Sequence, residues 1–159
     1  MIRVKSIDAT PTVTTVTIIT DIGEFVGVAR FNAEKDPLNP SAVIGGRIAE
    51  NRAKLKYYKQ KIKNKKYELK GLNRLLSSMP LRTKGRSYVV HTRNAIQSEI
   101  NEYYDICESC KYDIETAIEG RAMYLRSRTM NKENRDKFLN ELGESIKKLG
   151  KNKNKDKND

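Results

Sequence analysis

Apolar residues recur every seven positions between residues 41 and 76, and a second row of positions follows each of them by three. Spacings of seven and three place both rows on one face of a helix that lies along another helix. We therefore expect a long helix here that packs through this seam. The first row is Ile48, Leu55, Ile62, Leu69 and Leu76, and the second is Asn51, Tyr58, Lys65, Leu72 and Met79.

A second helix is expected over residues 88–128, after a short basic connector that favours an antiparallel helical hairpin. Arg121, Tyr124 and Arg128 continue its seam where apolar residues should stand. Because a buried unpaired Arg is costly, either the helices splay there, the guanidinium meets a carboxylate or an anionic ligand, or the helix end frays in solvent. The apolar part of this seam is Ile96, Ile100, Tyr103, Cys107, Cys110, Ile114 and Ala117.

Before the helices, the pattern is that of β-strands. Residues 13–19 are β-branched at every position, which predicts a strand. Residues 21–24 predict a turn in which Gly23 takes a positive φ, and residues 25–31 predict the returning strand. Residues 2–7 are expected to form a short edge strand that ends at residues 8–12.

The ends of the first helix and its glycines allow specific expectations. Asn39 is expected to cap this helix, with Pro40 at its first position, and Ser87 is expected to cap the second helix. Gly45 and Gly46 have two interpretations. They allow either close packing of backbone against the β-hairpin or a close approach of backbone to a ligand near the helix N-terminus.

Together these patterns predict an α+β fold with an N-terminal antiparallel β-hairpin or small sheet and a long two-helix antiparallel coiled-coil hairpin. The β-region is expected at residues 1–38 and the helical hairpin at 39–128. Residues 129–150 predict a separate short amphipathic helix after a break at 130–134. Residues 151–159 contain only Lys, Asn and Asp and are expected to be disordered.

The charge of the chain suggests an anionic partner. The net charge is +12, which favours nucleic acid, a nucleotide or an anionic membrane, although solubility with a basic tail also explains it. The chain begins without the apolar core of a signal peptide, and no apolar run reaches the length of a membrane span. We therefore expect a cytoplasmic protein that does not enter a membrane.

The two helices are expected to carry opposite charges. Attraction between them would act along the hairpin or between subunits. The first helix is basic through Arg52, Lys54, Lys56, Lys59, Lys61, Lys63, Lys66 and Lys70. The second is acidic in its middle through Glu99, Glu102, Asp105, Glu108, Asp113, Glu115 and Glu119.

Catalysis is not expected, because the chain shows no nucleophile–base motif and no phosphate-cradling loop. Cys107 and Cys110 have half of a zinc motif, but both lie on the helical seam, and His91 is the only histidine. Core packing is therefore the preferred interpretation of the two cysteines, and no metal or cofactor is expected.

Basic, aromatic and polar residues cluster between the connector and the first turns of the second helix. A helix N-terminus offers free N–H groups, Arg binds phosphates, and Tyr presents a face for stacking. A nucleotide-sized anion needs such groups, although a plain basic loop with a helix cap has the same composition. The cluster is Arg82, Lys84, Arg86, Tyr88, His91, Thr92, Arg93 and Asn94.

The run from Thr17 to Tyr58 resembles the small phage proteins of the anti-Thoeris signal-sponge family. The similar segments are EFVGVAR at 24–30, EKD at 34–36 and GRIAENRAKLKY at 46–57, with Ser87-Tyr88 also similar. The resemblance implies a β-hairpin followed by two long helices, assembled as dimers or hexamers in the host bacterial cytoplasm. It also implies sequestration, without degradation, of cyclic ADP-ribose-type signals, and in some members of cyclic di- or trinucleotides.

The chemistry of individual residues suggests how such a ligand would be held. Phe25 or Tyr88 would stack on the base, and His91 and Asn94 would make polar contacts. The rival hypotheses are a basic coiled-coil protein that binds nucleic acid and a structural coiled coil without a ligand. The residues expected to bind phosphates are Arg30, Arg47, Arg93 and Arg121.

Overall fold

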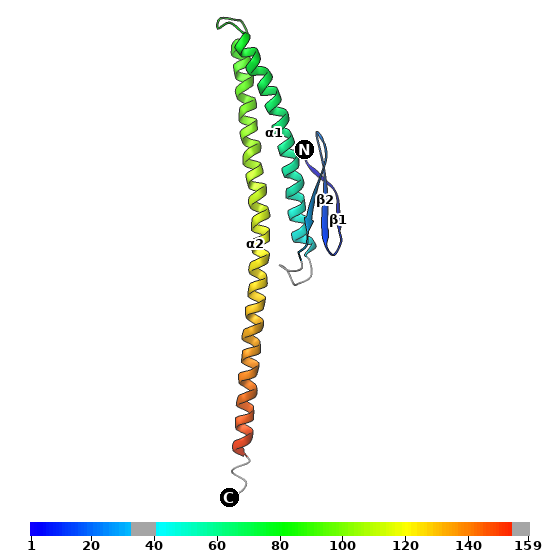
Figure 1. Cartoon of the computed structure of the whole chain (residues 1–159), viewed down its shortest axis with the longest axis vertical. Helices are drawn as coiled ribbons and strands as arrows, with labels where there is room; N and C mark the ends of the chain where they lie inside the picture. Colours follow the sequence, from blue (N-terminus) through cyan, green and yellow to red (C-terminus); the bar gives the residue numbers. More distant parts are fainter. Residues whose placement is uncertain (33–40, 154–159) are drawn as a thin grey trace. The chain divides into compact units, whose positions relative to one another are not determined.

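The computed structural model of the chain describes residues 1–32 and 41–153. Three strands precede two long helices, which confirms the α+β fold (Figure 1). The chain divides into two compact units, Met1–Glu119 and Gly120–Asp159. The elements are β1 (Arg3–Ala9), β2 (Val13–Thr20), β3 (Gly23–Arg30), α1 (Ala42–Ser78) and α2 (Arg86–Lys153).

The strands form an antiparallel sheet in the order β1-β2-β3. Gly23 has a φ of 128° at the turn between β2 and β3, which confirms the predicted positive φ. Glycine adopts this conformation readily because it has no Cβ atom. β1 continues to Ala9, beyond the predicted end at residue 7, because Asp8 and Ala9 pair with Thr15 and Thr14. The predicted break at residues 8–12 is therefore confined to residues 10–12.

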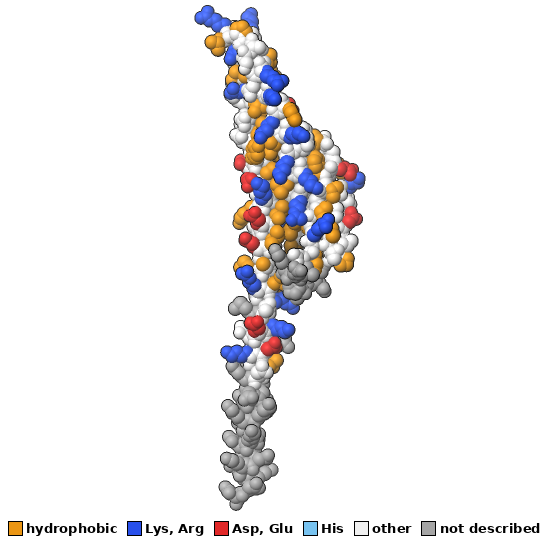
Figure 2. Space-filling model, in the orientation of Figure 1, with side chains coloured by type: hydrophobic (Ala, Val, Ile, Leu, Met, Phe, Trp, Pro, Cys, Tyr) orange, Lys and Arg blue, Asp and Glu red, His pale blue; other side chains and the backbone are white. Residues whose placement is uncertain are grey.

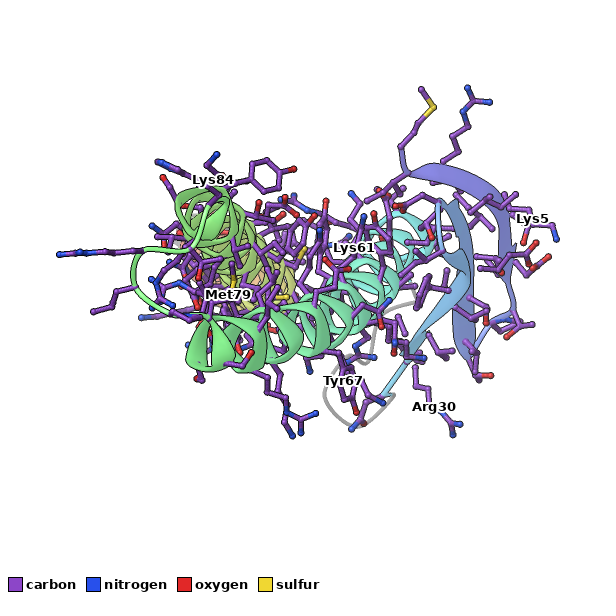
Figure 3. All side chains as sticks on the ribbon, turned by 90° about the horizontal axis from the view of Figure 1, so that it is seen from above. Lys5, Arg30, Lys61, Tyr67, Met79 and Lys84 are labelled. Carbon is purple, nitrogen blue, oxygen red and sulfur yellow. The ribbon has the colours of Figure 1, made fainter. Side chains whose placement is uncertain are left out.

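α1 covers one face of the sheet, mainly over β2 and β3. Alternate residues of β2 point toward α1, because successive strand residues face opposite sides of a sheet. They contact α1 residues that are four positions apart and so lie on one face of the helix. The sheet and α2 lie on different sides of α1 when the unit Met1–Glu119 is viewed along the helices (Figure 3). The resulting core consists of Val16, Ile18, Ala29, Ala49, Ala53 and Tyr57.

The closest approach between helix and sheet is at Gly27. A Cβ atom on Gly27 would overlap the carbonyl oxygen of Ala49 and lie 2.6 Å from the backbone nitrogen of Ala53. Gly45 is a second such point, because its Cβ would lie 2.6 Å from Oγ1 of Thr14. Close backbone packing against the hairpin therefore explains Gly45, whereas open space surrounds Gly46.

Both predicted helix caps were wrong. Ser41 caps α1, because its hydroxyl accepts a hydrogen bond from the backbone N–H of Ile44 at 3.3 Å. Asn39 and Pro40 lie outside the described residues. α2 begins at Arg86 rather than after Ser87, because Gly85 takes a positive φ of 87° and accepts the first helical bond from Val89.

α1 and α2 pack through the predicted seam from Leu55 onward, whereas Ile48 packs against the first core. Apolar side chains from both helices form a second core, which confirms the helical hairpin. Cys107 and Cys110 are buried free thiols on this seam, and burial raises the pKa of each. The second core consists of Ile62, Ile96, Ile100 and Cys107, with Leu55, Tyr58, Leu69, Leu72 and Tyr103 against them.

α2 runs without a break to Lys153. The predicted interruption at residues 130–134 and the separate short helix at 129–150 are therefore not found. Residues 130–134 contain no Pro or Gly, and Met, Lys and Glu are good helix formers, so the Asn residues alone do not end the helix. The expected disordered tail falls mostly outside the described residues, and Lys151 to Lys153 belong to α2.

A polar cluster joins the turn before β3 to α1. Asp21 accepts hydrogen bonds from the Tyr57 hydroxyl and the Lys61 ammonium, each at 2.7 Å. These donors lower the pKa of Asp21 to about 2. Burial and the bond to Asp21 raise the pKa of Tyr57 to about 12, and the bond to Asp21 also raises the pKa of Lys61.

We expect Gly27→Ala to lower the free energy of unfolding by about 1–3 kcal/mol, the usual cost of overpacking, or to prevent folding. The added methyl group would press on the backbone of α1, which has no side chain to move aside. Gly46→Ala is the matched control in the same helix. Open space at Gly46 lets Ala stabilise the helix by roughly 0.5–1 kcal/mol. Chemical denaturation measures both, and a Gly27→Ala protein as stable as wild type would contradict the close approach.

Asp21→Asn should reduce stability at neutral pH but have progressively less effect in acid. The folded pKa of Asp21 is about 2, below its ordinary value of 3.8, so the unfolded chain takes up this proton first. The stabilisation is complete above about pH 4 and is lost as the pH falls through about 2. Thermal unfolding of both proteins from pH 5 to 2 measures this convergence. Glu102→Gln, at an exposed carboxylate on α2, is the control, and a stability difference independent of pH would refute the role of Asp21.

Candidate anion-binding site

Apart from Lys56, which donates a hydrogen bond to the carbonyl of Val26, the lysines of α1 fall into two groups that differ in their partners. One group is neutralised by carboxylates. One of these ion pairs joins the two helices, as predicted, and the others do not. Lys65 lies 3.0 Å from Glu99 of α2 and 3.2 Å from Glu68. The other ion pairs of this group are Lys54 with Glu50 and Lys61 with Asp21, each at 2.7 Å.

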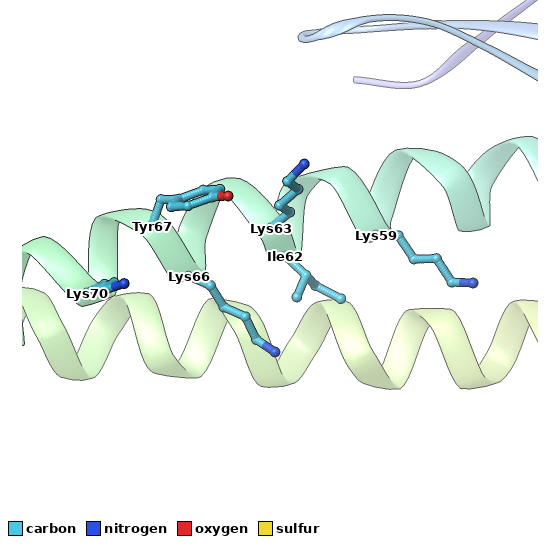
Figure 4. Close-up of a pocket in the computed structure, with 6 residues that line it drawn as sticks. All are labelled: Lys59, Ile62, Lys63, Lys66, Tyr67 and Lys70. Carbon is cyan, nitrogen blue, oxygen red and sulfur yellow. The ribbon is translucent and has the colours of Figure 1, made fainter.

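The second group lines a pocket of about 380 Å³. We call it the lysine pocket and define it by the four lysines together with Ile62 and Tyr67 (Figure 4). Within the described residues, none of the four ammonium groups lies within ion-pair distance of a carboxylate. The four are Lys59, Lys63, Lys66 and Lys70.

The seam of α1 explains where the lysine pocket lies. Its lysines are spaced four, three and four residues apart, so they follow one side of the helix. Ile62, at the base of the pocket, is buried between α1 and α2. The side chains of Lys59 and Lys66 extend toward α2, whereas Lys63 and Tyr67 lie on the side of α1 away from α2 (Figure 4).

Aromatic rings border these charges. Lys66 donates a hydrogen bond to the hydroxyl of Tyr104 on α2 at 2.7 Å, and its ammonium lies 5.3 Å from the centre of that ring. Tyr67 is 65% exposed and Tyr104 is 43% exposed, so both present part of a ring to solvent. The pocket therefore combines positive charge, a buried aliphatic side chain and exposed aromatic surface.

The charges of the pocket extend over a limited length. Eleven residues separate Lys59 from Lys70, which corresponds to about 16 Å of helix at 1.5 Å per residue. Figure 2 shows further Lys and Arg side chains along this region of α1. Neighbouring lysines of the set are three or four residues apart, about 5–6 Å along the helix, so two of them can reach one phosphate group. Their ammonium groups have no carboxylate partner among the described residues and can bind it.

The predicted site residues lie in separate places. Arg30 is exposed at the end of β3 (Figure 3), and Arg47 is in the second turn of α1, where it lies 3.5 Å from Asp113. Arg93 donates two hydrogen bonds to the side chain of its neighbour Asn94, at 2.8 and 3.2 Å. The structure therefore brings Arg93 and Asn94 into direct contact.

The basic connector and the start of α2 form one neighbourhood. Tyr88 is 75% exposed, and His91 is exposed one turn later. The guanidinium of Arg86 donates hydrogen bonds to the carbonyls of Leu76 and Met79 at the end of α1. Arg86 therefore has a structural role at this helix end. This neighbourhood is about 45 Å along α1 from Arg47, since 31 residues separate Arg47 from the end of the helix. One small ligand therefore cannot touch both within a single chain.

The remaining two predicted residues have other contacts. Phe25 is half-buried against the first core, where its ring meets that of Tyr57 edge-on with the centres 5.6 Å apart. Arg121 belongs to the unit that begins at Gly120, and its guanidinium lies 5.6 Å from the centre of the Tyr124 ring. Arg128 lies over the same ring at 5.9 Å, so cation–π contacts accompany the two arginines that interrupt the seam.

The sequence prediction missed the lysine pocket. Its signal was present as lysines spaced four, three and four residues apart with no acidic residue among those positions. The prediction expected the lysines of α1 to attract the acidic residues of α2 along the hairpin or between subunits. Only the structure separates the neutralised lysines from the others. The described residues hold no group of three or more His, Cys, Asp or Glu side chains placed to bind a metal ion.

No protein-family model matches this sequence, and no curated protein or solved structure matches it either. Of the helices that the structure describes, neither is long and apolar enough to cross a membrane.

Proposed function

We propose that this chain is a non-catalytic protein that binds small phosphate-bearing anions in the lysine pocket. The observation that carries the proposal is the set of four lysines without carboxylate partners around a volume of about 380 Å³. Sites for small molecules have volumes of about 300–1,000 Å³, so the pocket has room for a nucleotide-sized ligand.

The lining of the pocket supports a nucleotide rather than a simple inorganic ion. Ammonium groups bind phosphates as point charges, and the exposed ring of Tyr67 offers a face on which a base can stack. Ile62 adds an apolar contact at the base of the pocket. Four ammonium groups can neutralise more than one phosphate, which suits a ligand with two phosphates such as a cyclic dinucleotide.

The resemblance to anti-Thoeris signal sponges supports a more specific proposal. The similar residues at 46–57 lie on α1 directly before the lysine pocket. The chain would then hold cyclic ADP-ribose-type signals, or cyclic di- or trinucleotides, without cleaving them. In this proposal it removes an immune signal from solution and so inhibits a bacterial defence.

Nucleic acid is the second candidate partner, because Arg52 and Lys56 continue the spacing of the pocket lysines along α1. The basic line from Arg52 to Lys70 is about 27 Å long, enough to follow several phosphates of one strand. Both side chains, however, already donate hydrogen bonds to backbone carbonyls of β3, at 2.6 Å each. This engagement favours the smaller ligand, for which the pocket lysines suffice.

Calorimetry with glycocyclic ADP-ribose and with a cyclic dinucleotide should detect binding of at least one of them by the full-length protein. The combined substitution of Lys63→Gln and Lys66→Gln should weaken that binding about tenfold or more, because hydrogen bonds to charged groups contribute about 1.5–3 kcal/mol each. Lys111→Gln, at an exposed lysine that pairs with Glu108 outside the lysine pocket, is the control and should bind as wild type. Affinity should fall as salt is added.

Two further observations decide among the hypotheses: whether the released ligand is intact or cleaved, and whether the protein binds nucleotides or nucleic acid. Heat release should return the ligand intact, whereas a cleaved product would contradict a non-catalytic role. Failure of both ligands to bind would contradict the nucleotide proposal. A gel shift with single-stranded and duplex DNA tests the second candidate. Tight binding whose logarithm falls steeply with the logarithm of salt concentration would favour nucleic acid.

A further inference from the structure

The two edges of the sheet differ in how they are covered. α1 covers the free edge of β3, since Arg52 and Lys56 donate hydrogen bonds to the carbonyls of Val28 and Val26 at 2.6 Å each. β1 is the opposite edge, and within the part of the chain that the structure describes it pairs with β2 alone. An uncovered edge strand is a template on which a further strand can pair.

β1 also presents uncovered apolar side chains on the helix-facing side of the sheet. Val4 lies opposite Ile18, and Ile7 lies opposite Val16, so all four share this face. Ile18 and Val16 are fully buried under α1, whereas Val4 is 46% exposed and Ile7 is 59% exposed. α1 lies over β2 and β3, and the apolar strip on β1 extends beyond it.

The backbone groups of Val4 and Ile7 point toward the free edge. The carbonyls of Val26 and Val28 face away from β2, because they bind side chains of α1. Along an antiparallel ladder, successive residues direct their N–H and C=O groups to opposite sides of the strand. Val16 and Ile18 of β2, which pair with Gly27 and Phe25, therefore direct theirs toward β3. Val4 and Ile7 lie opposite those residues and direct their own N–H and C=O groups away from β2.

One feature that usually protects an edge strand is a charged lysine, and β1 carries Lys5. Its ammonium, however, lies 2.7 Å from the carboxylate of Glu24 in the same chain, which neutralises it. The irregularity between Val4 and Ser6 places Val4 and Ile7, three residues apart, on the same face.

We propose that β1 pairs with β1 of a second copy of this chain in an antiparallel register that places Val4 opposite Ile7 and Arg3 opposite Asp8. The same register brings Ile7 opposite Val4 and Asp8 opposite Arg3, so the strand is complementary to itself. A two-fold axis generates this kind of interface. The two sheets become one of six strands, and four apolar side chains meet between the two α1 helices.

The outer face of the proposed pair gains opposite charges. Arg3 lies opposite Ile19 and Asp8 opposite Thr15, both on the face away from α1. Each Arg3 would then face an Asp8 across the new pair, and opposite charges at directly paired positions are stabilising. The lysine pocket is not part of this surface, so the interface and the ligand site can be tested separately.

Charge reversal at these two positions tests the register. Sedimentation equilibrium at low salt should show a dimer for the full-length protein. Arg3→Asp or Asp8→Arg alone should raise the dissociation constant about tenfold or more, because each places like charges opposite each other twice. The double variant Arg3→Asp with Asp8→Arg should restore dimerisation. A monomeric wild-type protein, or a double variant no better than the single ones, would overturn the proposal.

Disulfide formation provides a second test that does not depend on charge. A protein with both Val4→Cys and Ile7→Cys should form a covalent dimer under oxidising conditions, because directly opposed residues lie within the distance that a disulfide spans. Neither single variant should do so efficiently, since Val4 is not opposite Val4 in this register. Buried Cys107 and Cys110 are the same in all three proteins. Equal cross-linking of the single and double variants, or none in any of them, would contradict the register.

Discussion

The contact of Gly27 with the backbone of Ala49 and Ala53 is the constraint on which the rest of the first unit depends. Because no side chain separates β3 from α1 there, the helix lies close enough for Arg52 and Lys56 to reach carbonyls of β3. Both donors lie within one helical turn of Ala53. A larger residue at Gly27 would move the helix outward and remove the cover from that edge of the sheet.

The packing of α1 against the sheet also determines which side of α1 is left to contact α2. The side of α1 that carries Ala49, Ala53 and Tyr57 is used by the sheet, so the helix contacts α2 through a different side. Tyr58 contributes to both cores, and the rings of Tyr57, Tyr58 and Tyr103 form a chain from sheet to α2 with centres 4.8 and 5.7 Å apart. α1 therefore packs against both the sheet and α2, and its heptad seam from Leu55 onward forms the contact with α2.

The pattern of apolar residues predicted the strands, the seams and the helical hairpin, because these depend on local periodicity. Helix ends were harder to predict. Ser41 and Asn39 are both good capping residues, and the local sequence does not decide between them. The continuation of α2 past Met130 was missed because loss of an apolar pattern was interpreted as loss of helix. A helix without an apolar stripe can still form where helix-forming residues and side-chain pairs three or four residues apart support it.

The site was less predictable than the fold because charge pairing is not local. Lys61 meets Asp21 forty positions away, and Lys65 meets Glu99 on another helix, so sequence alone does not show which lysines are neutralised. The division has an energetic consequence. Like charges that stay close together in the native state destabilise it, while an anion that binds only the folded chain stabilises it by mass action. Lysines that destabilise the empty protein are thus the ones through which a bound phosphate would contribute most to its stability.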